Sequence, residues 1–211
     1  MKVILVNGSP NEHGCTDAAL QEVAAALRAE GVETSFFWIG KQPIRGCVAC
    51  GGCSKLGKCV FDDVVNEFVA LAHEADGFVF GAPVHFAGIA GSMKCFMDRA
   101  FFSAPRSGES PFLLKPGAAI VSARRAGTTA ALDQLNKYLL YSQMLVPGSR
   151  YWNMVHGSTA ADVQQDQEGL QIMRVLGRNL AWLLKLKSAG ASAGIPLPEQ
   201  EAERLATNFI R

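Results

Sequence analysis

Four cysteines in one short, glycine-rich stretch are the side chains of this sequence best suited to metal or redox chemistry. They are Cys47, Cys50, Cys53 and Cys59, with the spacing C-x2-C-x2-C-x5-C. Three thiolates within seven residues can ligate separate corners of an iron–sulfur cubane, and a fourth thiolate can close the site. The neighbouring glycines let the backbone wrap around such a group. We therefore expect these four cysteines to hold a [4Fe-4S] cluster.

The same cysteines allow three other interpretations. A structural zinc ion also takes four thiolates, although zinc more often uses two separated C-x2-C pairs than a C-x2-C-x2-C run. The stretch could instead hold labile thiols that form disulfides, or it could bind no metal. Cys15 and Cys95 lie outside the run, and we expect small, partly buried side chains at both positions.

The elements that must position these residues alternate between strands and helices. Short apolar runs predict strands at Lys2–Asn7, Glu33–Ile39, Gly77–Gly81, Ala118–Ser122 and Met144–Pro147. Helical periodicity and capping residues predict helices from Thr16 to Gly31, from Asp62 or Asp63 to about Ala75, and from Thr129 to Ser142. Thr159 and Asp162 have the spacing of a capping box and are expected to open a long helix. Strands separated by helices imply a parallel sheet covered on both faces.

We expect one domain over residues 1–187, with residues 46–59 as a cysteine-rich insertion after the second strand. Residues 188–211 are then a linker and a C-terminal helix. The Gly, Ala, Ser and Pro content of Ser188–Pro198 predicts the linker, and Glu199–Ile210 predicts the helix. Because so short a helix is marginal alone, we expect it to dock on its own domain or on a neighbouring subunit.

The loop after the first strand has the features of an anion-binding site. It connects a strand to a helix N-terminus, where unpaired N–H groups favour an anion. It lacks both the lysine of a nucleoside-triphosphate loop and the G-x-G-x-x-G of a dinucleotide site, so the single terminal phosphate of a mononucleotide fits it best. An ordinary turn with Thr16 as the N-cap is the alternative. The candidate cofactor-binding residues here are Gly8, Ser9, Pro10, Asn11, Gly14, Cys15 and Thr16.

A second loop, after the third strand, leaves the sheet at the carboxyl ends of the strands, where open α/β sheets bind ligands. Its glycines let a flat ring approach the backbone, and Phe86 and His85 are candidates for the walls of that site. Alternatively, Phe86 packs in the core and His85 is a solvated loop residue. The candidate ring-binding residues are Pro83, Val84, His85, Phe86 and Gly88.

Together these loops resemble the flavodoxin-like NADPH-dependent FMN reductase family. The resemblance rests on Gly8-Ser9-Pro10 through Gly14 and Thr16, on Ala82-Pro83-Val84 with Gly88, and on Met93-Lys94 with Phe96, Asp98 and Arg99. It implies a doubly wound, five-stranded parallel sheet of order 2-1-3-4-5. Family members often carry a basic residue near position 11 or 12, whereas this sequence has Asn11 and Glu12.

The resemblance also implies a binding mode for FMN. The phosphate would lie in the first loop, and the isoalloxazine ring would lie against the second loop and a third one at Ser122–Thr129. In that third loop the candidate residues are Ser122, Arg124, Arg125 and Gly127. The two arginines would meet a nucleotide phosphate or a flavin carbonyl, or they are a solvated pair. Tyr151–Gly157 resembles the aromatic segment near the open flavin face.

The cysteine spacing matches the iron–sulfur flavoprotein branch of this family, whose members hold a [4Fe-4S] cluster beside FMN. The implied function is an FMN-dependent oxidoreductase that transfers electrons between NAD(P)H or a reduced carrier and an acceptor, through the cluster. No Ser/His/Asp or paired-carboxylate constellation stands out, and a flavin needs no protein nucleophile. We therefore predict no catalytic side chain. The expected partners are a small-molecule acceptor or a redox carrier protein.

Two other functions remain open. The first is a cluster-free NAD(P)H:quinone or FMN reductase. The second is a non-enzymatic binding module that zinc stabilises.

The charge balance bears on partners and location. Twenty basic and nineteen acidic residues leave a formal charge of +1, so we expect neither nucleic-acid nor membrane binding. The N-terminal apolar run is shorter than the roughly 7 to 15 residues of a signal-peptide core. We expect a cytoplasmic protein with reduced cysteines, and the resemblance implies a homodimer or homotetramer.

Overall fold

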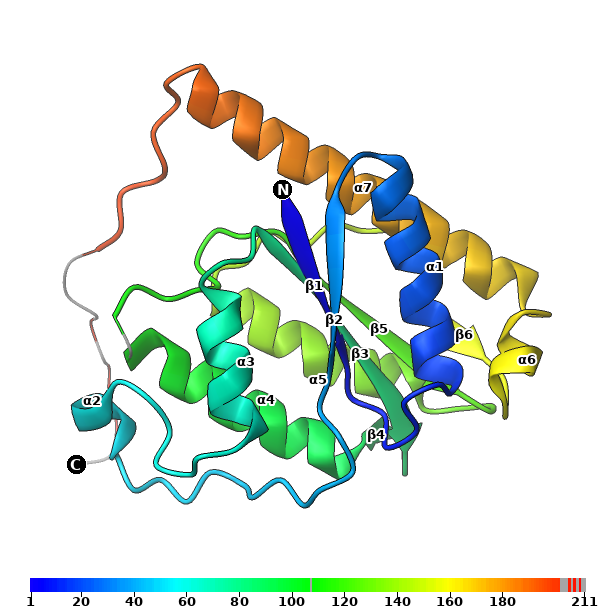
Figure 1. Cartoon of the computed structure of the whole chain (residues 1–211), viewed down its shortest axis with the longest axis horizontal. Coiled ribbons are helices and arrows are strands. Elements are labelled where there is room, and N and C mark those ends of the chain that lie inside the picture. Colours follow the sequence, from blue (N-terminus) through cyan, green and yellow to red (C-terminus); the bar gives the residue numbers. More distant parts are fainter. Residues whose placement is uncertain (107, 202–204, 206, 208, 210–211) are drawn as a thin grey trace.

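The computed structural model describes residues 1–106, 108–201, 205, 207 and 209. Within these residues the chain alternates between strands and helices (Figure 1). The strands are β1 (Lys2–Asn7), β2 (Glu33–Trp38), β3 (Gly77–His85), β4 (Gly88–Ile89), β5 (Gly117–Ala123) and β6 (Met154–His156). The α-helices are α1 (Cys15–Ala29), α2 (Cys53–Leu56), α3 (Val64–Ala72), α4 (Gly91–Ser103), α5 (Thr128–Tyr141), α6 (Ala160–Val163) and α7 (Gln167–Ser192). No helix of the described residues is long and apolar enough to cross a membrane.

The sheet has the order β2-β1-β3-β5-β6, and all pairs along this path are parallel. Counted along the chain without β4, these five strands follow the predicted order 2-1-3-4-5. The two-residue β4 was not predicted, and it pairs antiparallel with the end of β3. The chain winds outward in both directions from β1 and β3, so their carboxyl ends form the switch point where such sheets bind ligands.

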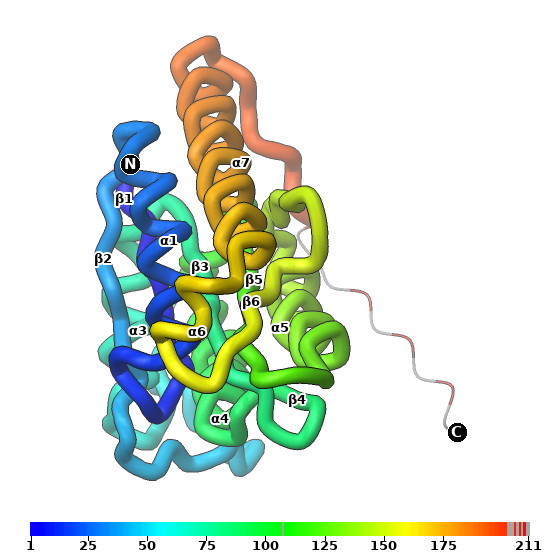
Figure 2. Tube along the Cα trace, turned by 90° about the vertical axis from the view of Figure 1, so that its right-hand side faces the viewer, coloured from blue at the N-terminus to red at the C-terminus, as the bar shows by residue number. Residues whose placement is uncertain are grey.

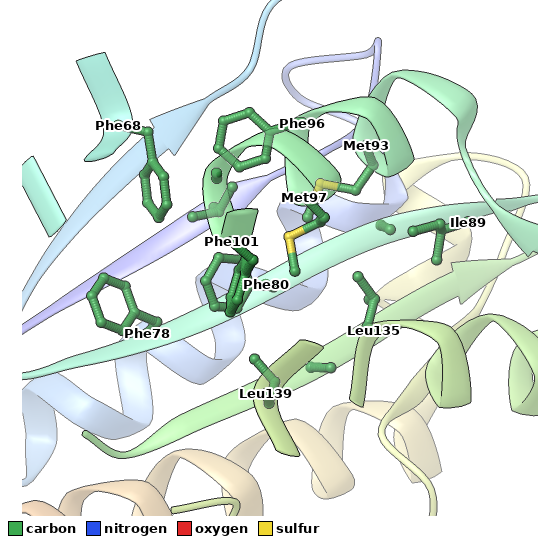
Figure 3. Close-up of a cluster of buried hydrophobic side chains, with 14 of the residues drawn as sticks. Phe68, Phe78, Phe80, Ile89, Met93, Phe96, Met97, Phe101, Leu135 and Leu139 are labelled. Carbon is green, nitrogen blue, oxygen red and sulfur yellow. The ribbon is translucent and has the colours of Figure 1, made fainter. Parts of the chain in front are cut away.

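Helices cover both faces of the sheet (Figures 1 and 2). Helices α1 and α7 pack on one face, where Val3 and Leu5 of β1 point. Helices α3, α4 and α5 cover the other face, where Ile4 and Val6 point. Alternate side chains of β1 are therefore buried on opposite sides, which explains its unbroken apolar run. Phenylalanines from β3, α3 and α4 fill much of the second core, with the side chains of α5 beside them (Figure 3).

The fifth parallel strand lies later in the sequence than predicted. The apolar run Met144–Pro147 contributes a single bridge between Leu145 and Pro116. Pro147 cannot donate a ladder hydrogen bond, and the chain leaves the sheet there. It returns at β6, which pairs with Val121–Ala123. The edge strand therefore lies beside the carboxyl end of β5.

The C-terminal part also differs from the prediction. The capping box of Thr159 and Asp162 forms, but it opens the four-residue α6. The long helix α7 begins at Gln167, where the side chain of Asp166 accepts the N–H of Gly169. It continues to Ser192, beyond the predicted linker start at Ser188.

The end of α7 is a Schellman motif. Gly194 adopts the left-handed conformation with a φ of 76°. Its N–H donates to Ala191 O, and the N–H of Ile195 donates to Gly190 O. The helix expected over Glu199–Ile210 includes residues 202–204, 206, 208 and 210, which lie outside the described residues.

Candidate functional site

A cleft of about 320 Å³ lies at the carboxyl ends of β1, β3 and β5, beside the start of α1. Most of the predicted cofactor-binding residues line it. These are Ser9, Pro10, Asn11, Gly14, Cys15, Thr16, Pro83, Val84, His85, Ser122 and Arg124. Ala123, Gly157 and Ser158 also line it. The structure thus brings the three predicted loops to one place.

The first loop is held by its own polar groups. Asn7 Oδ1 accepts the N–H of Ser9 at 3.0 Å, and Ser9 Oγ accepts the N–H of Asn11 at 3.1 Å. Helix α1 then begins with Gly14 as its N-cap, without a side-chain cap. Since Ala18 donates the first intrahelical bond to Gly14 O, the N–H groups before it lack helical partners. This arrangement suits an anion.

Thr16 is not the N-cap that the alternative interpretation required. Its side chain instead hydrogen-bonds to Ser122 across the cleft floor. Cys15 donates its thiol to Gly157 O at 3.4 Å, and burial raises the pKa of this thiol. The thiol therefore stays neutral beside the first loop.

The second loop reaches the cleft through Pro83, Val84 and His85 only. The chain then reverses through Phe86 and Ala87, whose φ angles are 49° and 58°, and β4 returns along β3. This is a two-residue hairpin turn, which carries the ring of Phe86 to the tip, where it is fully exposed. Phe86 is therefore neither a lining residue of the cleft nor a core residue.

Four other predicted residues do not line the cleft. Gly8 lies beneath it and donates its N–H to Gly81 O at 2.8 Å. Gly88 belongs to β4, and Arg125 is exposed. Gly127 has a φ of 91°, and a Cβ there would lie 2.6 Å from Ala87 Cα, so it allows the third loop to approach the hairpin turn.

Two residues were missed, one at the end of β2 and one in the segment that follows it. The Nε1–H of Trp38 bonds to Ser9 O at 2.8 Å. Trp38 and Lys41 line a second cavity, of about 520 Å³, with Asn11 and Glu12. The predicted strand order 2-1-3 could have identified them. In that order the second strand pairs with the first, so its end lies beside the first loop. In contrast, Tyr151 and Trp152 pack on each other and do not line the cleft.

The cysteine-rich segment runs from the end of β2 past α4 and α3 (Figure 1), and Arg99 of α4 hydrogen-bonds to Cys59. Cys47, Cys50, Cys53 and Cys59 line one small cavity together with Phe61 and Arg99. Cys53 is buried, and Cys47 and Cys50 are exposed. A Cβ at Gly52 would lie 2.5 Å from Val60 and 3.6 Å from Cys50 Sγ, so the glycine lets the segment close around the cavity.

The four thiols of this segment are the candidate metal ligands. Within the described part of the chain, no three Cys, His, Asp or Glu side chains converge as the ligands of a single ion. The four corners of a cubane hold their thiolates further apart than a single zinc ion does. The four cysteines around one cavity offer the all-sulfur donor set that an iron–sulfur cluster requires.

Comparisons with known proteins identify the family of this chain. The sequence profile of the NADPH-dependent FMN reductases matches residues 1–159. An iron-sulfur flavoprotein of Methanocaldococcus jannaschii is 32% identical over 193 residues, covering 88% of this chain and 98% of the relative. An iron-sulfur flavoprotein of Methanosarcina thermophila is 25% identical over 190 residues, covering 88% and 96%.

A solved structure confirms the predicted flavodoxin-like fold. The flavodoxin, WrbA-like protein of Agrobacterium tumefaciens superposes with a TM-score of 0.61 at 16% identity, over 88% of this chain and 98% of that protein.

Proposed function

The chain belongs to the NADPH-dependent FMN reductase family and is an FMN-dependent oxidoreductase, and from this premise we propose that it also carries a [4Fe-4S] cluster on Cys47, Cys50, Cys53 and Cys59. With both groups bound, the protein passes electrons between NAD(P)H or a reduced carrier and an acceptor. The observation that carries the proposal is that all four cysteines of the run line one cavity. The names of the two relatives, both iron-sulfur flavoproteins, support it.

The cleft is the proposed FMN site. Bound FMN supplies the hydride and electron chemistry, and the protein orients it. The hydroxyls of Ser9 and Thr16 and the first N–H groups of α1 bind the phosphate. Pro83 and Val84 give the flat ring an apolar wall, and Arg124 meets a flavin carbonyl or a nucleotide phosphate.

Lys41 supplies the positive charge that the first loop itself lacks. It lies beside Asn11 and Glu12 in the adjoining cavity. A cation there offsets the repulsion between the carboxylate of Glu12 and a phosphate dianion. The protein thus obtains its basic residue from the segment after β2 rather than from the loop.

Anaerobic purification followed by assays for FMN, iron and acid-labile sulfide tests the proposal. We expect FMN together with about four iron and four sulfide per chain, the content of a [4Fe-4S] cluster. Cys50→Ser should lose iron and keep FMN, whereas the control Cys95→Ser, outside the run, should keep both. A yellow protein that contains neither iron nor sulfide would refute the proposed cluster. Steady oxidation of NAD(P)H by that protein, with a quinone as acceptor, would support a cluster-free reductase.

A further inference from the structure

Among the residues that the structure describes, Arg99 is the largest side chain that is almost completely buried, with 1% of its surface exposed. It extends from α4 toward the cysteine-rich segment. Each of its N–H donors has an acceptor. Nε donates to Cys59 Sγ at 3.2 Å, Nη1 to Asp63 Oδ2 and Arg45 O, and Nη2 to Asp63 Oδ1 and Phe61 O. Its guanidinium therefore has a single orientation, fixed by the two-pronged contact with Asp63.

The hydrogen bond from Arg99 Nε to Cys59 Sγ is not needed to neutralise the buried charge of Arg99. Asp63 already balances the charge of Arg99, at 2.6 and 2.9 Å. A protonated thiol is a weak hydrogen-bond acceptor, but a thiolate that ligates iron carries charge that an N–H of a cation stabilises. The geometry aims a permanently charged donor at one of the four proposed ligands.

We propose that Arg99 is a positioning residue for the cluster, which fixes Cys59 at one corner and raises the reduction potential through its hydrogen bond to Cys59 Sγ. The inference rests on the proposed function, because it requires the cluster. On reduction the cluster gains one electron, no bond breaks, and Arg99 keeps its proton. A positive donor at a ligand sulfur stabilises the more negative, reduced form, and hydrogen bonds to sulfur are a known control on such potentials.

Two substitutions should shift the potential in opposite directions. Arg99→Gln removes the cation and should lower the potential. Asp63→Asn removes the anion that neutralises Arg99 and should raise it, while Asn still caps α3, as Asp63 does for the N–H of Val65. We expect each to change the ratio of reduced to oxidised cluster about tenfold at a fixed solution potential, or about 59 mV for one electron.

Arg45→Gln is the matched control. Arg45 lies over the same Phe61 ring, 5.2 Å from its centroid compared with 5.0 Å for Arg99, but it is exposed and does not bond to sulfur through its side chain. Its replacement removes an equal charge without removing the hydrogen bond. We expect a much smaller shift than in Arg99→Gln.

The measurement is a redox titration of the holoprotein with dithionite and mediators, followed by the electron paramagnetic resonance signal of the reduced cluster. Wild-type protein that contains no iron would refute the proposed cluster, and this inference with it. A loaded Arg99→Gln protein with the wild-type potential would overturn the inference. If Arg99→Gln fails to fold, Asp63→Asn decides: a raised potential supports the role of Arg99, and an unchanged or lowered one overturns it.

Discussion

Thr16 Oγ1 and Ser122 Oγ lie 2.8 Å apart and share one hydrogen bond at the floor of the cleft. Thr16 belongs to the first turn of α1, and Ser122 lies near the end of β5. Both residues are buried, with 1% and 3% of their surfaces exposed. The bond therefore connects the proposed phosphate loop to the third loop, two segments that are 106 residues apart.

Thr16→Val should destabilise the FMN-free protein by about 1 to 3 kcal/mol, because it leaves the buried hydroxyl of Ser122 without this partner. Valine keeps the methyl group that packs near Gly81. In the double variant Thr16→Val/Ser122→Ala both polar groups are gone, so much of the lost stability should return. Urea unfolding measures all three proteins. A double variant that is no more stable than Thr16→Val would contradict the coupling.

Gly8→Ala should destabilise the protein by about 1 to 3 kcal/mol, because the added methyl overpacks the floor of the cleft. A Cβ at Gly8 would lie 2.4 Å from Met93 Sδ and 2.8 Å from the backbone oxygen of Gly81. The thioether can move, but the Gly81 oxygen is held by the N–H of Gly8 itself. Gly91→Ala at the start of α4 is the control, since a Cβ there meets nothing within 4 Å. Equal unfolding midpoints for the two variants would refute the expectation.

Replacing Phe86-Ala87 by Asn-Gly should stabilise the protein by about 1 kcal/mol. Both residues have positive φ angles, which cost energy for side chains other than glycine or asparagine and which Asn-Gly adopts readily. FMN affinity should not change, since neither residue lines the cleft. The single variant Phe86→Ala separates the loss of the exposed ring from the relief of backbone strain, because it removes the ring but leaves both positive φ angles in place. A fall in FMN affinity in either variant would show that Phe86 contributes to FMN binding.

The sequence was informative where local patterns coincide with tertiary structure. Val3 to Val6 predicted a strand buried on both faces, and the resemblance supplied the strand order. The edge strand β6 was missed because its three residues are too few to show a period, while the apolar side chains of 144–147 resembled a strand. The Phe86-Ala87 turn was missed because it lacks the glycine or asparagine that marks such hairpins.

Contacts between distant segments could not be predicted. The four cysteines were found from their spacing alone, but Arg99 follows Cys59 by 40 residues and no periodicity connects them. Lys41 and Trp38 likewise reach the first loop through the pairing of β1 with β2. Spacing therefore identified the candidate ligands, and only the packed chain revealed which charges surround them.

Asp162 gives a prediction on pH dependence. Its Oδ2 accepts the N–H groups of Ser158 at 2.8 Å and Thr159 at 2.9 Å, and these bonds lower the pKa of the carboxyl below its ordinary 3.8. A lowered folded-state pKa means that the carboxylate stabilises the protein above about pH 3.8 and loses this effect as the pH falls through the folded value. The turn that it orders carries Ser158 into the cleft.

Asp162→Asn should therefore be less stable than wild type near neutral pH, and the difference should shrink as the pH falls below about 4. Urea midpoints of the FMN-free proteins across the acid range measure this difference. Asp133→Asn, which changes an exposed carboxylate on α5, serves as the control and should follow the wild-type curve. If the curves of wild type and Asp162→Asn stay parallel down to acid pH, the charged carboxylate does not order the turn, and the Thr159 side chain alone holds it through the N–H of Asp162.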